Sequence, residues 1–211
     1  MERGLVLVAA SGLAREVLSV CDALGRRVDA ILDDHPGKQG TTVAGVRVFG
    51  PVESVTSFPD AEVLICAGKG TSRRAIAARL AAQGLEERRY ATLVDPTVRI
   101  PRSCTVGVGT ILLAGVVLTA DVTIGRHAVC MPHVTLTHDV VLEDYATLTA
   151  GVSLAGGVRV GEAAYVGMNA SAREGVTIGA EAILGMGAAL IGDQPGGSVY
   201  TGVPARPRKG R

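Results

Sequence analysis

Aromatic residues are scarce in this sequence: tryptophan is absent, and Phe, Tyr and Trp together make up 3% of 211 residues. Apolar residues of all kinds nevertheless reach 47%, and there are 28 glycines. A core with so few rings must be filled by Val, Ala, Leu and Gly, which suits thin, closely stacked layers. The length allows one domain or two small ones.

Strongly basic regions are also missing. The net charge is +1, and basic residues cluster only in the C-terminal segment 206–211. Binding to nucleic acid normally needs a basic face with stacking aromatic residues. We therefore interpret the segment as a solvated end and expect no nucleic acid as a partner.

The cysteines are few and form no CxxC pair: they are Cys21, Cys66, Cys104 and Cys130. This spacing predicts buried thiols in a reducing compartment rather than a zinc site or a disulfide framework. The N-terminal residues run directly into an apolar strand pattern, and no apolar run approaches the length of a membrane span. We expect a cytoplasmic protein without a membrane partner.

Residues 1–93 alternate apolar runs with helical patterns, which predicts an α/β N-terminal domain with a small Rossmann-like parallel sheet. Residues 35–45 are polar and rich in glycine, which predicts a loop. We expect Thr71 to cap the second helix. The expected strands cover 5–9, 28–32, 46–49 and 62–67, and the expected helices cover 13–24 and 71–82.

A six-residue frame begins at Val98 and runs without insertion to Asp193, giving sixteen hexads. The first position is almost always Val or Ala, the third Leu, Ile or Val, and the fourth is often Gly. The first and third side chains of a strand share one face, and strands stack about 4.8 Å apart. Three hexads can therefore close one coil of a triangular prism.

The frame predicts a parallel β-helix of about five coils in residues 94–211. One hexad cannot bury its apolar face alone, whereas stacked coils form a continuous core. A sandwich of Val-rich strands is the alternative, but sandwiches do not keep an unbroken six-residue frame. The frame does not reveal the hand of the coil, and right-handed crossovers are the general rule.

Three stretches resemble the hexapeptide-repeat sugar acetyltransferases, in particular the UDP-4-amino-sugar N-acetyltransferases and the sialic acid O-acetyltransferase type. They are residues 8–16, the Ile-Leu-Asp-Asp of 31–34, and the block of hexads with the Thr-His-Asp of 137–139, closed by the Gly-Val-Pro-Ala of 202–205. The resemblance implies a left-handed β-helix and a homotrimer. It also implies acetyl-CoA as co-substrate between neighbouring prisms, a UDP-linked sugar on the N-terminal domain, and a histidine as general base.

His138 occupies the fifth place of its hexad, beside a corner, and Asp139 follows it. Attack of an amine or hydroxyl on a thioester needs a group that accepts a proton, and histidine is suited to this role. Asp139 can fix the tautomer of the ring, and a backbone N–H can stabilise the oxyanion. We predict His138 and Asp139 as catalytic residues; a surface histidine on a turn is the alternative.

The turns after the N-terminal strands are predicted to bind the nucleotide sugar. The turn at Ser11 and Gly12 can hold a phosphate at a helix start, and Asp33 and Asp34 can bond a base or ribose. A tight strand–helix turn without a ligand is the alternative. The predicted substrate-binding residues are Ser11, Gly12, Leu13, Asp33, Asp34 and Gly68.

The resemblance places Thr147, Gly156, Met168 and Met186 along the coenzyme groove. Its usual Asn ahead of the catalytic histidine corresponds to Met131, and its second histidine corresponds to Thr147. The family usually has Gly or His where this chain has Leu13 and Ala14. These departures put the acceptor, and possibly the acyl group, in question more than the reaction class.

His133 precedes His138 by five residues, and a similar pair holds zinc in the γ-class carbonic anhydrases. That class takes a third histidine from about two coils earlier, where residues 97–102 contain none, so we expect no metal. The predicted function is N-acetylation of an amino sugar on a UDP carrier. O-acetylation, transfer of another acyl group, a zinc hydratase and a non-catalytic β-helix protein are the alternatives.

Overall fold

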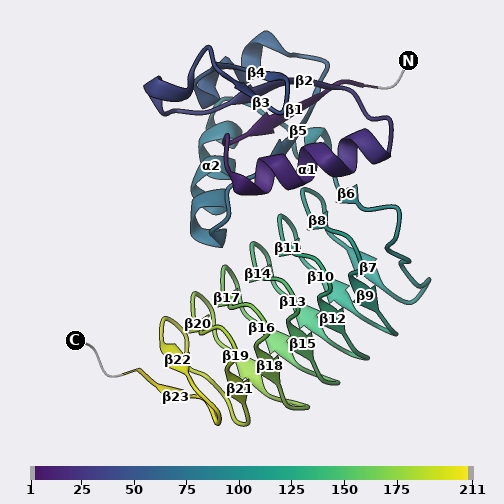
Figure 1. The fold of residues 1–211 in the computed structure, drawn as a ribbon, viewed down its shortest axis with the longest axis vertical. Helices are drawn as coiled ribbons and strands as arrows, with labels where there is room; N and C mark the ends of the chain where they lie inside the picture. The colour runs from purple at the N-terminus through teal and green to yellow at the C-terminus, as the bar shows by residue number, and fades with distance from the viewer. Residues whose placement is uncertain (1–2, 209–211) are drawn as a thin grey trace.

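The computed structural model describes residues 3–208. It contains a small sheet with two helices, followed by a long stack of short parallel strands (Figure 1). The end of the basic segment, residues 209–211, lies outside the described residues. The beginning of the segment was predicted to be a solvated end. It is exposed but ordered, because Arg206–Pro207 forms a strand, β23, that pairs with the preceding strand.

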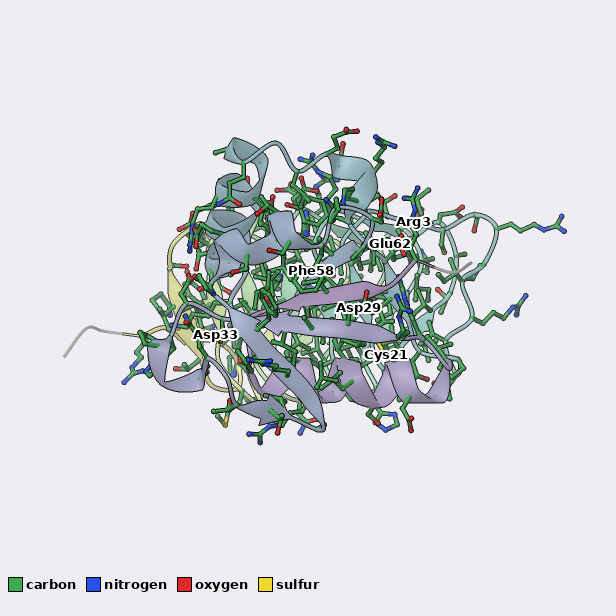
Figure 2. All side chains as sticks on the ribbon, turned by 90° about the horizontal axis from the view of Figure 1, so that it is seen from above. Arg3, Cys21, Asp29, Asp33, Phe58 and Glu62 are labelled. Atoms are coloured by element: carbon green, nitrogen blue, oxygen red, sulfur yellow. The ribbon has the colours of Figure 1, made fainter. Side chains whose placement is uncertain are left out.

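The N-terminal sheet has the strand order β3-β4-β2-β1-β5. Only the pairing of β3 with β4 is antiparallel. Figure 2 looks onto this region from above, with Asp29 and Asp33 towards opposite ends of β2. The strands are β1 (Leu5–Val8), β2 (Val28–Leu32), β3 (Thr42–Val43), β4 (Val46–Gly50) and β5 (Glu62–Ile65). The helices are α1 (Gly12–Ala23) and α2 (Gly70–Ala82), with short 3-10 turns at Pro36–Lys38, Val52–Ser57 and Glu87–Arg89.

Helix α1 lies between the sheet and the first coils of the stack (Figure 1). Its hydrophobic face shares one buried cluster with Leu7 of the sheet and with Ile111 and Val129 of the coils. Ser11 caps the helix by accepting a hydrogen bond from the backbone N–H of Ala14. The sheet and the coils are therefore joined through a common core.

Two local predictions for this region were wrong. Residues 35–45 contain a 3-10 turn and β3, because the pair Ala44 and Gly45 adopts positive φ and closes a tight hairpin with β4. Helix α2 begins at Gly70 after an N-cap at Lys69, so Thr71 is not the cap. This first residue packs closely against the coils, since a Cβ at Gly70 would lie 2.1 Å from the carbonyl oxygen of Tyr145.

The stack consists of three sheets whose strands are mostly two residues long and come from the second and third places of the hexads. The first sheet contains β7 (Thr105–Val106), β10 (Thr123–Ile124), β13 (Val141–Leu142), β16 (Arg159–Val160) and β19 (Thr177–Ile178). The second contains β6 (Leu93–Val94), β8 (Ile111–Leu112), β11 (Val129–Cys130), β14 (Thr147–Leu148), β17 (Tyr165–Val166), β20 (Ile183–Leu184), β22 (Val199–Thr201) and β23 (Arg206–Pro207). The third contains β9 (Val117–Leu118), β12 (Thr135–Leu136), β15 (Ser153–Leu154), β18 (Ser171–Ala172) and β21 (Ala189–Leu190).

The hexad frame explains this packing. The first and third residues of a hexad, such as Val140 and Leu142, are buried in a core that runs the length of the stack. The sixth residue often turns the corner with positive φ, as Asp139 does. These features confirm the β-helix prediction.

The first hexad departs from the frame. Residues 98–103 form no strand, and Ile100 is exposed. In the following hexads the fourth residue donates its backbone N–H to the next coil, as Gly107 does to Ile124. Pro101 occupies that place and has no N–H to donate.

Candidate active site

His138 and Asp139 occupy an exposed corner just after β12. The Nδ1 atom of His138 lies 2.8 Å from Oδ2 of Asp139, and both side chains are about two-thirds exposed, at 67% and 65%. A carboxylate can only accept, so this contact places the hydrogen on Nδ1. The other ring nitrogen, Nε2, is then left as a proton acceptor.

Gly156 supports the His138 ring from the following coil. A Cβ at Gly156 would lie 2.4 Å from Cε1 and 2.5 Å from Nε2 of His138, which is closer than side chains approach. The absence of a side chain at Gly156 therefore sets the position of the imidazole. Contact of Gly156 with the coenzyme stays a prediction.

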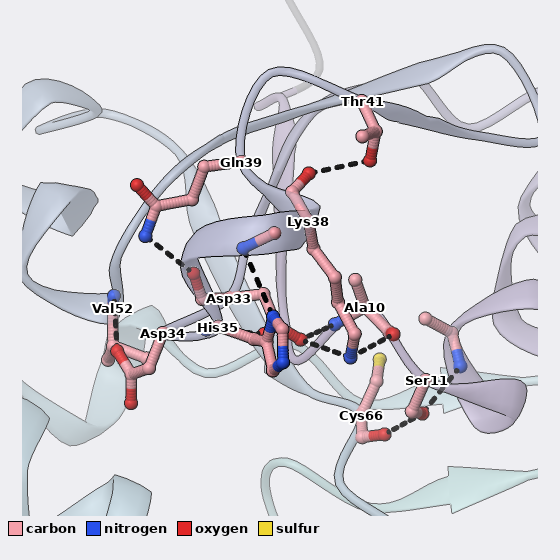
Figure 3. Close-up of polar contacts among 12 residues, drawn as sticks. Ala10, Ser11, Asp33, Asp34, His35, Lys38, Gln39, Thr41, Val52 and Cys66 are labelled. Atoms are coloured by element: carbon pink, nitrogen blue, oxygen red, sulfur yellow. Dashed lines mark hydrogen bonds and ion pairs between the residues drawn. The ribbon is translucent and has the colours of Figure 1, made fainter.

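A polar network at the C-terminal end of β2 surrounds Asp33 (Figure 3). Oδ2 of Asp33 accepts from the backbone N–H of Ala10 at 2.8 Å and from Nζ of Lys38 at 3.0 Å. Oδ1 accepts from the N–H of His35 at 2.9 Å. Burial would raise the pKa of Asp33, but these hydrogen bonds and the charge of Lys38 outweigh it and hold the pKa below its usual range.

Sequence reasoning missed Lys38, which lies in the segment assigned to a loop. Its Nζ also donates to the carbonyl oxygen of Ala10 at 2.9 Å, so it lies beside the turn that follows β1 (Figure 3). Its place shortly after Asp33 and Asp34 was the available signal. The ammonium group, which is ion-paired with Asp33, places a positive charge beside the predicted phosphate site.

Ser11 connects the ends of β1 and β5. Its Oγ donates to the carbonyl oxygen of Cys66 at 2.6 Å while capping α1 (Figure 3). Gly12 is exposed at the first turn of the helix, whereas Leu13 is buried in the core at 4% exposure. Any contact of Leu13 with a ligand must therefore use its backbone.

Asp34 points away from the network around Asp33. Its carboxylate accepts from Arg79 of α2 at 2.6 Å and from the backbone N–H of Val52 at 3.1 Å. The hydrogen bond from Arg79 is the largest cause that holds the pKa of Asp34 below its usual range. The two aspartates, which were predicted to act together, therefore have different hydrogen-bond partners in the structure.

A cavity of about 610 Å³ lies between the start of α2 and the second sheet of the stack. Gly68, a predicted substrate contact, lines it, and so does Met131. The remaining lining residues are Lys69, Gly70, Thr71, Ser72, Ala163, Tyr165, Glu181 and Ile183. His138 follows a strand of the third sheet and does not line this cavity.

The four predicted coenzyme residues do not lie on one surface of the chain. Thr147 is fully buried, and its Oγ1 contacts Arg73 at 3.0 Å and the carbonyl oxygen of Gly68 at 3.3 Å. The side chain of Thr147 is therefore not available to a coenzyme, contrary to the sequence prediction. Met168 and Met186 are 53% and 80% exposed, and they stack on consecutive coils.

The other corner histidines differ from each other. His133 is exposed and lies against Gly115, whereas His127 is 4% exposed, stacked on Tyr145 and edge-on to Tyr90. Burial, with the charges of Arg73 and Arg126, lowers the pKa of His127 to about 4. Within residues 3–208 no group of three or more His, Cys, Asp or Glu side chains could hold a metal ion.

No described protein family and no curated protein matches the sequence. Solved structures do match. Perosamine N-acetyltransferase from Caulobacter crescentus, in complex with CoA and GDP-perosamine, is 29% identical, with a TM-score of 0.91 over 99% of each chain. The acetyltransferase domain of PglB from Neisseria gonorrhoeae, in complex with acetyl coenzyme A, is 27% identical, with a TM-score of 0.89 over 99% of this chain and 100% of that domain.

The chain is an acyltransferase. Its likeness to these proteins confirms the resemblance to hexapeptide-repeat sugar acetyltransferases and the prediction of acetyl-CoA as co-substrate. WeeI from Acinetobacter baumannii, at 24% identity and a TM-score of 0.87 over 98% of this chain and 100% of WeeI, shares the fold. None of the helices in the described part of the acyltransferase is long and apolar enough to cross a membrane.

Proposed function

We propose that the acyltransferase moves the acetyl group of acetyl-CoA to the amino group of a sugar carried on a nucleoside diphosphate. The observation that carries this proposal is the corner pair His138 and Asp139. Asp139 contacts Nδ1 of the ring and leaves Nε2 to accept a proton, on a side chain that is about two-thirds exposed. The similar perosamine N-acetyltransferase binds CoA and a nucleotide-linked amino sugar. A histidine variant of that enzyme was also solved with both ligands.

The reaction needs no covalent enzyme intermediate. The sugar nitrogen attacks the thioester carbonyl carbon, and Nε2 of His138 takes a proton from that nitrogen. Asp139 supports the imidazolium that forms through Nδ1. The tetrahedral intermediate then collapses, the C–S bond breaks, and the sulfur of coenzyme A leaves and gains a proton. Backbone N–H groups at a corner are the proposed oxyanion donors.

The proposed nucleotide site lies at the point in the N-terminal sheet where the strand order reverses. Strands β2 and β4 lie on one side of β1 and β5 lies on the other, and ligands of parallel sheets bind at the carboxyl ends of strands at such a point. Ser11 spans β1 and β5 there, and Lys38 adds a positive charge. The start of α1 supplies free N–H groups for a phosphate. The resemblance to the UDP-4-amino-sugar N-acetyltransferases implies UDP as the carrier, and GDP is the carrier in the similar perosamine enzyme.

We propose a homotrimer because one chain does not complete the site. His138 belongs to the third sheet, whereas the cavity beside Gly68 faces the second sheet. A neighbouring copy can bring its histidine to this cavity, and the exposed Met168 and Met186 offer apolar surface for the contact. Light scattering tests this assembly, and the mass of a single chain under assay conditions would refute it.

An acceptor panel tests the proposed function. Thiol release from acetyl-CoA should require a nucleotide-linked amino sugar, and mass spectrometry should show the product heavier by one acetyl group. Matched sugars with a hydroxyl in place of the amine test O-acetylation, and UDP and GDP versions test the carrier. The proposal fails if the hydroxyl sugars react faster than the amino sugars, or if no sugar nucleotide is acetylated.

A further inference from the structure

Arg73 is a fully buried cation in α2, with 0% of its surface exposed. No carboxylate is among its hydrogen-bond partners in residues 3–208. Burial lowers the pKa of its guanidinium to about 10, so the group stays charged at neutral pH. A buried charge is costly unless hydrogen bonds satisfy it, and here all partners are neutral oxygen atoms.

The guanidinium of Arg73 joins three segments that are far apart in the sequence. Nη1 donates to the end of β5, Nε donates to the corner before β11, and Nη2 donates to β14 and the corner before it. The acceptors are the carbonyl oxygens of Ala67 at 2.9 Å, Gly68 at 3.1 Å, His127 at 2.8 Å, Tyr145 at 2.8 Å and Ala146 at 3.1 Å, with Oγ1 of Thr147 at 3.0 Å. One rigid group thus fixes the N-terminal sheet to the coils.

These contacts lie directly behind the large cavity. Residues 68–72 form one of its walls, and Met131, Tyr165 and Ile183 contribute to the opposite one. Thr147 adds a contact to Gly68 from the side of the coils, and Gly70 has no room for a Cβ against Tyr145. Because Arg73 itself is buried, it can influence a ligand only through the wall that it holds.

The same wall is connected to the proposed nucleotide site. Cys66 immediately precedes the residues that Arg73 contacts, and its carbonyl oxygen accepts the hydrogen bond from Oγ of Ser11. Ala67 and Gly68 follow it and accept from Arg73. The loop from 66 to 68 is therefore held at one end by the nucleotide turn and at the other by the coils.

We infer that Arg73 is a positioning residue that sets the distance between the nucleotide-binding end of the sheet and the coil residues of the cavity, Met131, Tyr165 and Ile183. This inference rests on the proposed function. A planar guanidinium can bond three segments at once, whereas the ammonium group of a lysine is a single point of charge. A displacement of about 1 Å at a reacting centre can cost about 10²-fold in rate.

Steady-state kinetics with Arg73→Lys provide the first test. We expect kcat/KM for the sugar nucleotide to fall on the order of tenfold or more, with a higher KM for that acceptor and little change in KM for acetyl-CoA. Thr147→Val should act in the same direction but less, and its effect should not add to that of Arg73→Lys. A role in stability alone would lower the active fraction and leave both KM values unchanged.

Arg74→Lys is the matched control, because it makes the same substitution at the next residue of α2. Arg74 also reaches the coils, through exposed ion pairs with Glu162 and Glu181. Glu181 lines the cavity, and a lysine keeps a positive charge beside it, so both KM values should stay as in the wild type. An equal effect of Arg74→Lys and Arg73→Lys would overturn the inference.

Hydrogen exchange gives a readout that does not depend on catalysis. The amides of residues 68–72 should exchange faster in Arg73→Lys and Thr147→Val than in the wild type or Arg74→Lys. If the wild type acetylates no sugar nucleotide, the proposed function fails, while exchange still decides whether Arg73 holds this wall. Unchanged exchange in both variants, or an unchanged acceptor KM in an active Arg73→Lys enzyme, overturns the inference.

Discussion

The imidazole of His138 lies against Gly156 of the following coil, where even a methyl group would come within 2.4 Å of Cε1. The two residues are related by one turn of the stack, since the backbone N–H of Gly157 donates to the carbonyl oxygen of His138. The coil below His138 is thus shaped to hold its ring, while Asp139 orients it from the side.

Gly156→Ala should displace the His138 ring. The new methyl group clashes with Cε1 and Nε2, so we expect kcat to fall about 10-fold to 10²-fold because the base is misplaced. The matched control is Gly192→Ala, at the same place of its hexad, where a Cβ meets nothing within 4 Å. Full activity in Gly156→Ala, measured by thiol release, would show that the ring position seen here is not needed.

His138→Asn should remove the general base and lower kcat about 10²-fold to 10⁴-fold, as general bases contribute that much. His133→Asn is the control, because His133 is another exposed corner histidine but is not paired with a carboxylate by the described contacts. If His138→Asn keeps more than about a tenth of the rate, another group takes the proton.

Asp139→Asn tests the orientation of the ring separately. Asparagine tolerates the positive φ at this corner, and its amide can donate to Nδ1, which would move the ring hydrogen to Nε2. We expect a lower kcat with unchanged KM for acetyl-CoA, since the protein would hold the unproductive tautomer. A variant as fast as the wild type would remove Asp139 from the mechanism.

His127 should make the fold sensitive to mild acid. Its pKa falls from 6.5 to about 4 on folding, so the unfolded chain binds the proton more tightly between these values. The free energy of unfolding therefore decreases as pH falls from 6.5 towards 4, by up to about 3 kcal/mol from this group. Urea titrations at several pH values should show a shallower decrease for His127→Asn. Parallel curves for the two proteins would contradict the prediction.

Lys38→Met should weaken acceptor binding more than coenzyme binding. The substitution removes the positive charge beside the β1–α1 turn but keeps a side chain of similar length. Hydrogen bonds to charged groups contribute about 1.5–3 kcal/mol, so KM for the sugar nucleotide should rise about tenfold or more. Arg88→Gln, which removes an exposed cation far from this network, is the control. Equal rises in both KM values would place Lys38 outside the nucleotide site.

The features that the sequence predicted best depend on short-range patterns. The six-residue frame defined the β-helix core, and the adjacency of His138 and Asp139 placed them at one corner. Their contact with Gly156 also follows from the frame, because residues three hexads apart become neighbours. Pro101 interrupts the frame because proline has no backbone N–H, and this follows from the residue type alone.

The features that the sequence did not reveal depend on how distant segments pack. Thr147 occupies an outward-facing place of its hexad, and only the docking of α2 buries it. His127 is buried because Tyr90, from the segment before the coils, covers it. Lys38 approaches Ala10 through a turn in a segment without periodicity. Long-range packing of this kind leaves little local signal, and in these cases only the place of Lys38 shortly after Asp33 and Asp34 offered one.

Stacked coils with bare ends could add further chains without limit, because unpaired strand edges are templates for polymerisation. The third sheet ends at β9 because Pro101 withholds the donor that another strand would need. At the far end of the second sheet, β22 is covered by the antiparallel β23. An architecture suited to fibres is thereby kept to a finite length by residues at the two ends of the stack.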